Sequence, residues 1–155
     1  KDQYQEDGNS AVKTLKATGT IEPGIVCRLQ AEGGMVDAGL HPAAGGDGEA
    51  ACSGDMLLQS LVACSGVTLA AVSTAMGIPL ESAEITAEGD LDFRGTLGVS
   101  KEVPIGFAAI RLRFDIKSDA SDEQIATLQK LTERYCVIFQ TIQQPMEIAL
   151  GTVRL

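Results

Sequence analysis

MLLQSLVACSGVTLAAVSTAM, residues 56–76, is the longest apolar stretch of the chain and decides its fold class. Ser53 just before it is a good N-cap residue and Gly77 follows it, so we expect one long helix between these two positions. Polar residues such as Gln59 and Thr74 interrupt the run, which favours a buried core helix over a membrane span. Apolar residues surround almost the whole helix, so it should be covered on all sides, and packing against the same helix of a second copy is the simplest cover.

The segments around this helix predict strands. Three short apolar pieces within residues 11–40 are separated by Glu-Pro-Gly and Gly-Gly turn signals, which indicates a three-stranded meander. The Gly- and Ala-rich residues 41–54 predict a loop. Residues 83–93, AEITAEGDLDF, predict a strand. In residues 105–118, apolar and charged side chains alternate with a period of two, as in a strand with one buried face.

A second helix is predicted after Ser121, which forms a capping box with Gln124. Apolar residues follow at helical spacing up to Tyr135, so this helix is amphipathic and packs on one side only. A short mixed segment and a terminal strand over 146–155 complete the chain. We therefore predict an α+β fold with a largely antiparallel sheet, in a single domain spanning 1–155 whose polar residues 1–10 are flexible.

Composition excludes several classes of function. The chain of 155 residues has a formal net charge of -9, so its mean field repels nucleic acid. Four cysteines are too few for a disulfide-stapled secreted scaffold, and a reducing cytoplasm would leave them free for chemistry. We expect a cytoplasmic protein that binds neither nucleic acid nor a membrane.

Two cysteines far apart in the chain, Cys64 and Cys136, both lie in apolar segments that should be buried. A thiol reacts as its thiolate, and burial raises the pKa of a thiol, so a cation or a helix N-terminus must offset that effect. Cys64 lies too deep in its own helix for that helix's N-terminus, so we expect an arginine to activate it. The alternative is that both cysteines are unreactive and serve only as small hydrophobic residues of the core. Cys52, at the helix start, is an alternative partner thiol or a packing residue, and Cys27 fits a core residue of a strand.

The flanking motifs carry a family resemblance. GLHPAAGGDGEAACSGDMLLQSLVAC (39–64) and ERYCVIFQTIQQP (133–145) resemble the osmotically inducible protein C and organic hydroperoxide resistance (OsmC/Ohr) family. The resemblance implies an intertwined homodimer and a thiol peroxidase that reduces organic hydroperoxides to alcohols without a metal or organic cofactor. Cys64 would become a sulfenic acid, Cys136 would close a disulfide with it, and an external dithiol, such as that of a lipoylated protein, would reduce that disulfide.

The resemblance also implies an arginine near the reactive thiol, held by a carboxylate on the same helix as that thiol. Arg28 is our candidate arginine and Asp55 our candidate carboxylate, with Lys13, Lys16 and Arg134 as alternatives to Arg28. The hydroperoxide-resistance branch has a glutamate ten positions before the cysteine, whereas Asp55 lies nine before Cys64. That branch commonly has proline after the second cysteine, whereas this chain has Val137.

His41, Leu61 and Phe139 are candidates for lining the substrate site, and His41 also fits a residue that braces its loop. No pair of cysteines or histidines has metal-ligand spacing, so no metal is expected. Apolar residues around both thiols suit an organic peroxide better than hydrogen peroxide. The alternative function is a non-enzymatic stress protein of the same fold that binds a small apolar ligand at the dimer interface.

Overall fold

The computed structural model describes residues 1–31 and 34–154 of the chain. The chain divides into two compact units, residues 1–53 and residues 54–155. The mixture of helices and mainly antiparallel strands confirms the α+β fold class. The expectation of a single domain over 1–155 stays a prediction.

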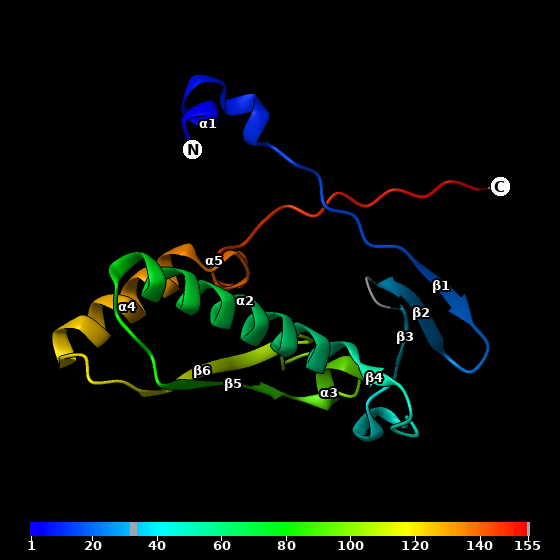
Figure 1. Ribbon diagram of the computed structural model, residues 1–155. Helices are drawn as coiled ribbons and strands as arrows, with labels where there is room; N and C mark the ends of the chain where they lie inside the picture. Colours follow the sequence, from blue (N-terminus) through cyan, green and yellow to red (C-terminus); the bar gives the residue numbers. More distant parts are fainter. Residues whose placement is uncertain (32–33, 155) are drawn as a thin grey trace. The chain divides into compact units, whose positions relative to one another are not determined.

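The N-terminal unit contains the predicted meander, here a sheet in the order β1-β2-β3-β4 (Figure 1). The first three strands pair antiparallel, as the turn signals indicated, although β1 begins only at Gly19. Residues 2–6 form one helical turn without a buried residue, and the flexibility of residues 1–10 stays a prediction. The elements of this unit are α1 (Asp2–Glu6), the 3-10 helix η1 (Gly8–Ala11), β1 (Gly19–Glu22), β2 (Val26–Ala31), β3 (Gly34–Gly39), the 3-10 helix η2 (Pro42–Ala44) and β4 (Ala51–Cys52).

The prediction of an unbroken loop over 41–54 was wrong in two places. Residues 42–44 form η2, which His41 begins by accepting a hydrogen bond at Nδ1 from the backbone N–H of Ala43 at 3.0 Å. Residues 51 and 52 form the short strand β4, which pairs parallel with β3. Sequence propensity misses so short a strand, because its hydrogen bonds depend on the neighbouring β3 rather than on its own residues.

The turn between β1 and β2 has an unusual backbone conformation. Gly24 has φ of 83°, which glycine adopts at little cost, and Ile25 next to it has φ of 61°. Ile25 is the sole described residue other than glycine with positive φ. A β-branched side chain is poorly suited to this region, because its Cβ crowds the backbone carbonyl.

The C-terminal unit is built on α2 (Ser53–Met76), the long helix that the sequence predicted. It starts on Ser53 itself and ends where Gly77 adopts a left-handed conformation with φ of 65°. Every fourth residue of one stripe is fully buried: Leu61, Ser65, Leu69 and Ser73. Other residues of α2 are partly or fully exposed, and Val67 is 73% exposed. The expected cover on all sides stays a prediction.

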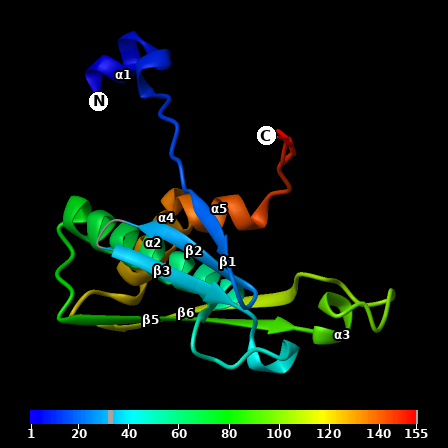
Figure 2. The same ribbon diagram turned by 90° about the vertical axis from the view of Figure 1, so that its right-hand side faces the viewer.

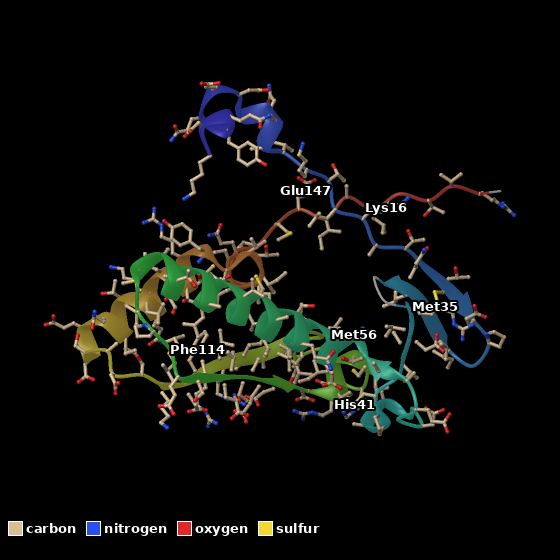
Figure 3. All side chains as sticks on the ribbon, viewed as in Figure 1. Lys16, Met35, His41, Met56, Phe114 and Glu147 are labelled. Atoms are coloured by element: carbon tan, nitrogen blue, oxygen red, sulfur yellow. The ribbon has the colours of Figure 1, made fainter. Side chains whose placement is uncertain are left out.

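The helix α2 crosses one face of a two-stranded antiparallel sheet made by β5 (Ser82–Leu91) and β6 (Phe107–Lys117), as Figures 1 and 2 show. The alternation predicted for β6 is confirmed, since Ile110, Leu112 and Phe114 are shielded while the charged residues between them are exposed. Phe114, labelled in Figure 3, lines a cavity together with Ser65 of α2. A short helix, α3 (Phe93–Thr96), follows β5.

The second predicted helix is α4 (Asp122–Tyr135), with both hydrogen bonds of the capping box between Ser121 and Gln124. The segment after Cys136, expected to be mixed, is a separate helix, α5 (Val137–Gln143). The predicted terminal strand was wrong, because residues 146–154 have no regular structure (Figure 3 labels Glu147 in this segment). A strand needs a neighbouring edge for its backbone hydrogen bonds, and no pairing involves these residues.

Candidate thiol site

The two cysteines singled out in the sequence come together in the C-terminal unit. Cys64 lies in the middle of α2, and Cys136 is the single residue between α4 and α5. The Cys136 backbone N–H donates to the carbonyl of Thr132 at 2.9 Å, and its carbonyl accepts from the N–H of Gln140 at 3.0 Å. Both helices therefore fix the backbone of Cys136, which has extended dihedral angles between them.

The surroundings of Cys64 favour its thiolate. Desolvation is the largest single influence and raises the pKa of this thiol. Hydrogen bonds from the Ile138 N–H, the Cys136 thiol and the Val137 N–H act in the opposite direction, and the pKa lies below its ordinary value. Donors that bond the charged form of an acid stabilise that form, which explains the sign. Cys64 is half-buried rather than fully buried as expected, so a small reagent can reach it.

The donors that stabilise Cys64 are backbone groups of the first turn of α5. We had expected an arginine, since Cys64 is far from the N-terminus of its own helix. The structure shows that the N-terminus of a different helix supplies N–H groups, those of Val137 and Ile138. The first N–H groups of a helix have no partner within it, so they are free to bond an anion. Burial alone therefore does not decide the pKa of Cys64, and the expected activating arginine stays a prediction.

Cys136 is deeply buried, with 1% of its surface exposed. Its Sγ lies 3.3 Å from the Oγ of Ser65, which is itself 0% exposed. The Cys136 thiol also hydrogen-bonds the Cys64 thiol. The sulfur of Cys136 thus contacts two consecutive residues of α2, and the site has the two adjacent thiols that a disulfide requires.

The candidate arginine has partners within its own sheet. The Nε of Arg28 donates to Asp37 at 2.8 Å and its Nη2 to the second oxygen of Asp37 at 2.9 Å, while Glu22 lies 3.6 Å from Nη1. The hydrogen bond to Asp37 is the main cause that raises the pKa of Arg28, and the same bond lowers the pKa of Asp37. The roles of Arg28 and Asp55 toward Cys64 stay predictions. Among the alternatives, the Arg134 guanidinium stacks over the Tyr135 ring, 5.5 Å from its centroid.

The remaining predicted site residues fall in four environments. Leu61 is buried in the stripe of α2, 2% exposed. Phe139 lines an inner cavity of about 190 Å³ together with Cys136. Asp55 lies in the first turn of α2 and lines an open surface hollow of about 420 Å³. His41 braces its loop through the bond to Ala43. Its predicted role in lining the site stays a prediction.

The other two cysteines, Cys52 and Cys27, belong to the N-terminal sheet. Cys52 is in β4 and Cys27 in β2, and both are half-buried. Cys27 pairs with Ala38, whereas Cys52 pairs with the next residue of β3, so the two side chains point to opposite faces of the sheet. In the part of the chain that the structure describes, no group of three or more His, Cys, Asp or Glu side chains could hold a metal ion.

Sequence reasoning missed four donors and acceptors of this site. The N–H groups of Val137 and Ile138 have no residue-type signature, because every residue except proline has one. Ser65 and Thr68 stand next to Cys64 at helical spacing, which is the signal that would have shown them. Thr68 donates through Oγ1 to the carbonyl of Cys64 at 2.7 Å. Of these two hydroxyl groups of α2, that of Thr68 bonds the backbone of Cys64, whereas that of Ser65 contacts the sulfur of Cys136.

Comparison with known proteins identifies the family of the chain. The family described as OsmC-like protein matches residues 46–151, which include both cysteines. The chain belongs to this family. The helix α2 is long and apolar enough to cross a membrane by length and composition alone, a test that the core helix of a globular protein also passes. No curated protein sequence matches the chain.

Solved structures of OsmC-like proteins share the fold at low sequence identity. An OsmC-like protein from Mycoplasma pneumoniae superposes with a TM-score of 0.71 and 17% identity, covering 84% of this chain and 88% of that one. An organic hydroperoxide resistance protein from Legionella pneumophila gives 0.66 and 19%, covering 85% and 90%. An OsmC-like protein of unknown function from Vibrio cholerae gives 0.62 and 13%, covering 84% and 94%. These matches confirm the OsmC-like fold and include relatives both with and without a stated function.

Proposed function

We propose that this chain is a thiol peroxidase that reduces organic hydroperoxides to alcohols. The observation that carries the proposal is the hydrogen-bonded pair of Cys64 and Cys136, in which the pKa of Cys64 is lowered by the donors around it. A thiolate next to a second thiol is the arrangement that a two-cysteine peroxidase needs. Some relatives of the same fold are organic hydroperoxide resistance proteins, which agrees with this substrate class.

The reaction proceeds in two steps. The Cys64 thiolate attacks the distal peroxide oxygen, so an S–O bond forms, the O–O bond breaks, and the alkoxide takes up a proton and leaves as the alcohol. The sulfur of Cys136 then attacks the sulfur of the Cys64 sulfenic acid. Its proton and the hydroxyl group of the sulfenic acid leave together as water, and a disulfide remains. An external dithiol, such as a lipoylated protein, would reduce this disulfide by thiol exchange.

Access to the two thiols fits this order of events. Cys64 is half-buried and can meet a peroxide, whereas Cys136 is covered and meets the sulfur of Cys64. An open groove of about 480 Å³ borders Cys136, and both Tyr135 and Met146 line it, so an organic substituent has apolar surface nearby. Such surface favours an organic hydroperoxide over hydrogen peroxide.

We also propose that the protein is a homodimer in the cytoplasm. The exposed apolar faces of α2 need cover that the single chain does not supply, and Val67 is the clearest example. The terminal segment leaves Ile148 and Leu150 82% and 96% exposed, with the alternation of a strand but without a neighbouring strand. Light scattering after size-exclusion chromatography tests the dimer, and a monomer at micromolar concentration would contradict it.

The decisive experiment compares reduced wild type with Cys64→Ser, Cys136→Ser and, as a matched control, Cys27→Ser. Each protein is mixed with cumene hydroperoxide, peroxide loss is followed, and the products are located by peptide mapping. We expect Cys64→Ser to abolish consumption, Cys136→Ser to stop after one turnover with a sulfenic acid at Cys64, which a second equivalent of peroxide oxidises to the sulfinic acid, and Cys27→Ser to behave as wild type. Slow oxidation of all four cysteines alike would refute the peroxidase.

A second candidate is the non-enzymatic binder of a small apolar ligand, and the inner cavity of about 190 Å³ favours it. Three apolar side chains, Leu112, Phe114 and Phe139, line this cavity, while Gln129 and Glu133 add polar groups. If the peroxide assay fails, tight binding of a small apolar molecule with loss of affinity in Phe139→Ala would support the binder.

A further inference from the structure

The hydroxyl group of Ser65 contacts the sulfur of Cys136, and either group can be the donor of this hydrogen bond. The Oγ of Ser65 and the Sγ of Cys136 are 3.3 Å apart, and neither side chain is accessible to water. Sulfur is a weak hydrogen-bond partner, and a buried hydroxyl normally finds a stronger one. The contact with a thiol is therefore unusual for a fully buried serine.

The other hydroxyl groups that hydrogen-bond along α2 show that this contact is particular to Ser65. Ser60, Thr68 and Thr74 each donate to the backbone carbonyl four residues earlier, at 2.9, 2.7 and 2.8 Å. Ser73, in the same buried stripe as Ser65, donates to a carbonyl just beyond the helix, at 2.6 Å. Each of these four hydroxyl groups donates to a backbone carbonyl close by in the sequence, whereas Ser65 contacts a side chain 71 residues away.

We propose that Ser65 is a positioning residue for Cys136, holding its sulfur against Cys64 and donating a hydrogen bond to it as the Cys136 proton leaves. This inference rests on the proposed peroxidase function. It concerns the second step, in which the Cys136–Cys64 bond forms, the S–O bond of the sulfenic acid breaks, and water is released. The first step, attack by Cys64 on the peroxide, does not involve the Ser65 hydroxyl.

The geometry explains why a positioning group is needed. The two sulfur atoms must meet at a specific angle for a disulfide to form, and a cysteine side chain has three staggered positions around its first torsion. The hydroxyl of Ser65, one residue after Cys64 on the same helix, favours the position in which Cys136 faces Cys64. A hydrogen bond to a developing thiolate is stronger than one to a neutral thiol, so the contact strengthens as the step proceeds.

Ser65→Ala tests the proposal, with Ser73→Ala as the matched control from the same buried stripe. Ser65→Thr retains the hydroxyl at a position that borders a cavity of about 190 Å³. Rapid mixing with cumene hydroperoxide gives two readouts: first-turnover peroxide consumption and the rate at which the Cys64–Cys136 disulfide forms. Mass spectrometry gives a third, the fraction of Cys64 converted to sulfinic acid.

We expect Ser65→Ala to consume the first equivalent of peroxide at the wild-type rate, to form the disulfide about tenfold more slowly, and to accumulate sulfinic acid at lower peroxide concentration. Ser65→Thr should restore most of the disulfide rate, and Ser73→Ala should leave it unchanged. An unchanged disulfide rate in Ser65→Ala would overturn the proposal, as would an equal slowing in Ser73→Ala. Thermal unfolding of each variant shows that the fold is retained.

Two measurements distinguish a failure of the Ser65 role from a failure of the proposed peroxidase function. If wild type consumes no peroxide, the proposed function fails. Closure of the Cys64–Cys136 disulfide by diamide, which takes up the two electrons and two protons of the thiols, then tests Ser65 alone. Slower closure in Ser65→Ala than in Ser73→Ala would support the positioning role, and equal rates would overturn it.

Discussion

Replacing Val137 by proline should make Cys64 less reactive without disturbing the fold. The backbone N–H of Val137 donates to the Cys64 thiol and makes no backbone hydrogen bond, so proline removes only this donor. Val137 is the first residue of α5, a position that proline tolerates well. Cys136 before it has φ of -72° and ψ of 108°, which suits a residue that precedes proline. The side chain of Val137 is 68% exposed, so little packing is lost.

The size of the effect follows from the number and kind of donors. A hydrogen bond to a charged group contributes about 1.5–3 kcal/mol, and solvent at a half-exposed sulfur reduces that contribution. The bond from Ile138, which has the larger effect, remains, as does that from Cys136. Because about 1.4 kcal/mol corresponds to a factor of ten, we expect the thiolate fraction at pH values below the pKa of Cys64 to fall about three- to tenfold.

Alkylation by iodoacetamide as a function of pH, with peptide mapping to isolate Cys64, measures this change. Val137→Ala is the matched control, because it shortens the side chain and retains the N–H. The rate–pH profile of Val137→Pro should shift to higher pH, whereas that of Val137→Ala should coincide with wild type. Coincident profiles for all three proteins would refute the reasoning that backbone donors of α5 activate Cys64.

Four further predictions concern stability. Leu128 is fully buried, so Leu128→Ala should lower the free energy of unfolding, measured with denaturant, by about 2–5 kcal/mol. Leu150 is exposed, so Leu150→Ala should change that free energy little. Ile25→Gly should raise the unfolding free energy by up to about 1 kcal/mol, because glycine accepts positive φ; a loss would show that the isoleucine side chain matters more. Ser121→Ala should lower the same free energy by about 0.5–2 kcal/mol through loss of the capping box, and intact stability would argue against that cap. The pKa of Cys64 is lowered on folding, so its contribution to stability is fully present above the unfolded pKa of about 8.5 and is lost as pH falls through the folded value. Wild type and Cys64→Ser should therefore diverge in unfolding free energy as pH rises toward 8.5, and a constant difference would contradict this.

The parts of the fold that the sequence predicted are those with their own local signal. Gly77 ends α2 through positive φ, and Ser121 begins α4 through its side-chain bond. The two-residue period of β6 gives its buried face directly. Each of these features depends on residues close together in the chain, so the chain itself shows them.

The parts that the sequence did not predict depend on distant partners. The strand β4 exists because β3 lies beside it, and residues 146–154 have the pattern of a strand without such a neighbour. The family resemblance singled out Cys64 and Cys136, and the structure places them in contact. The backbone donors of α5 remained hidden, because their role comes from the position of Val137 and not from its side chain.

Cys136 ends α4 and caps the start of α5, so one residue belongs to the boundaries of two helices. A covalent bond from it to Cys64 would join three helices and close a loop of 136 − 64 = 72 residues. Closing a loop of that length removes freedom from the unfolded chain equivalent to about 4 kcal/mol. The oxidised protein should therefore resist proteolysis far better than the reduced one. Limited digestion of a cell extract would then report the redox state of this thiol pair without any assay of activity.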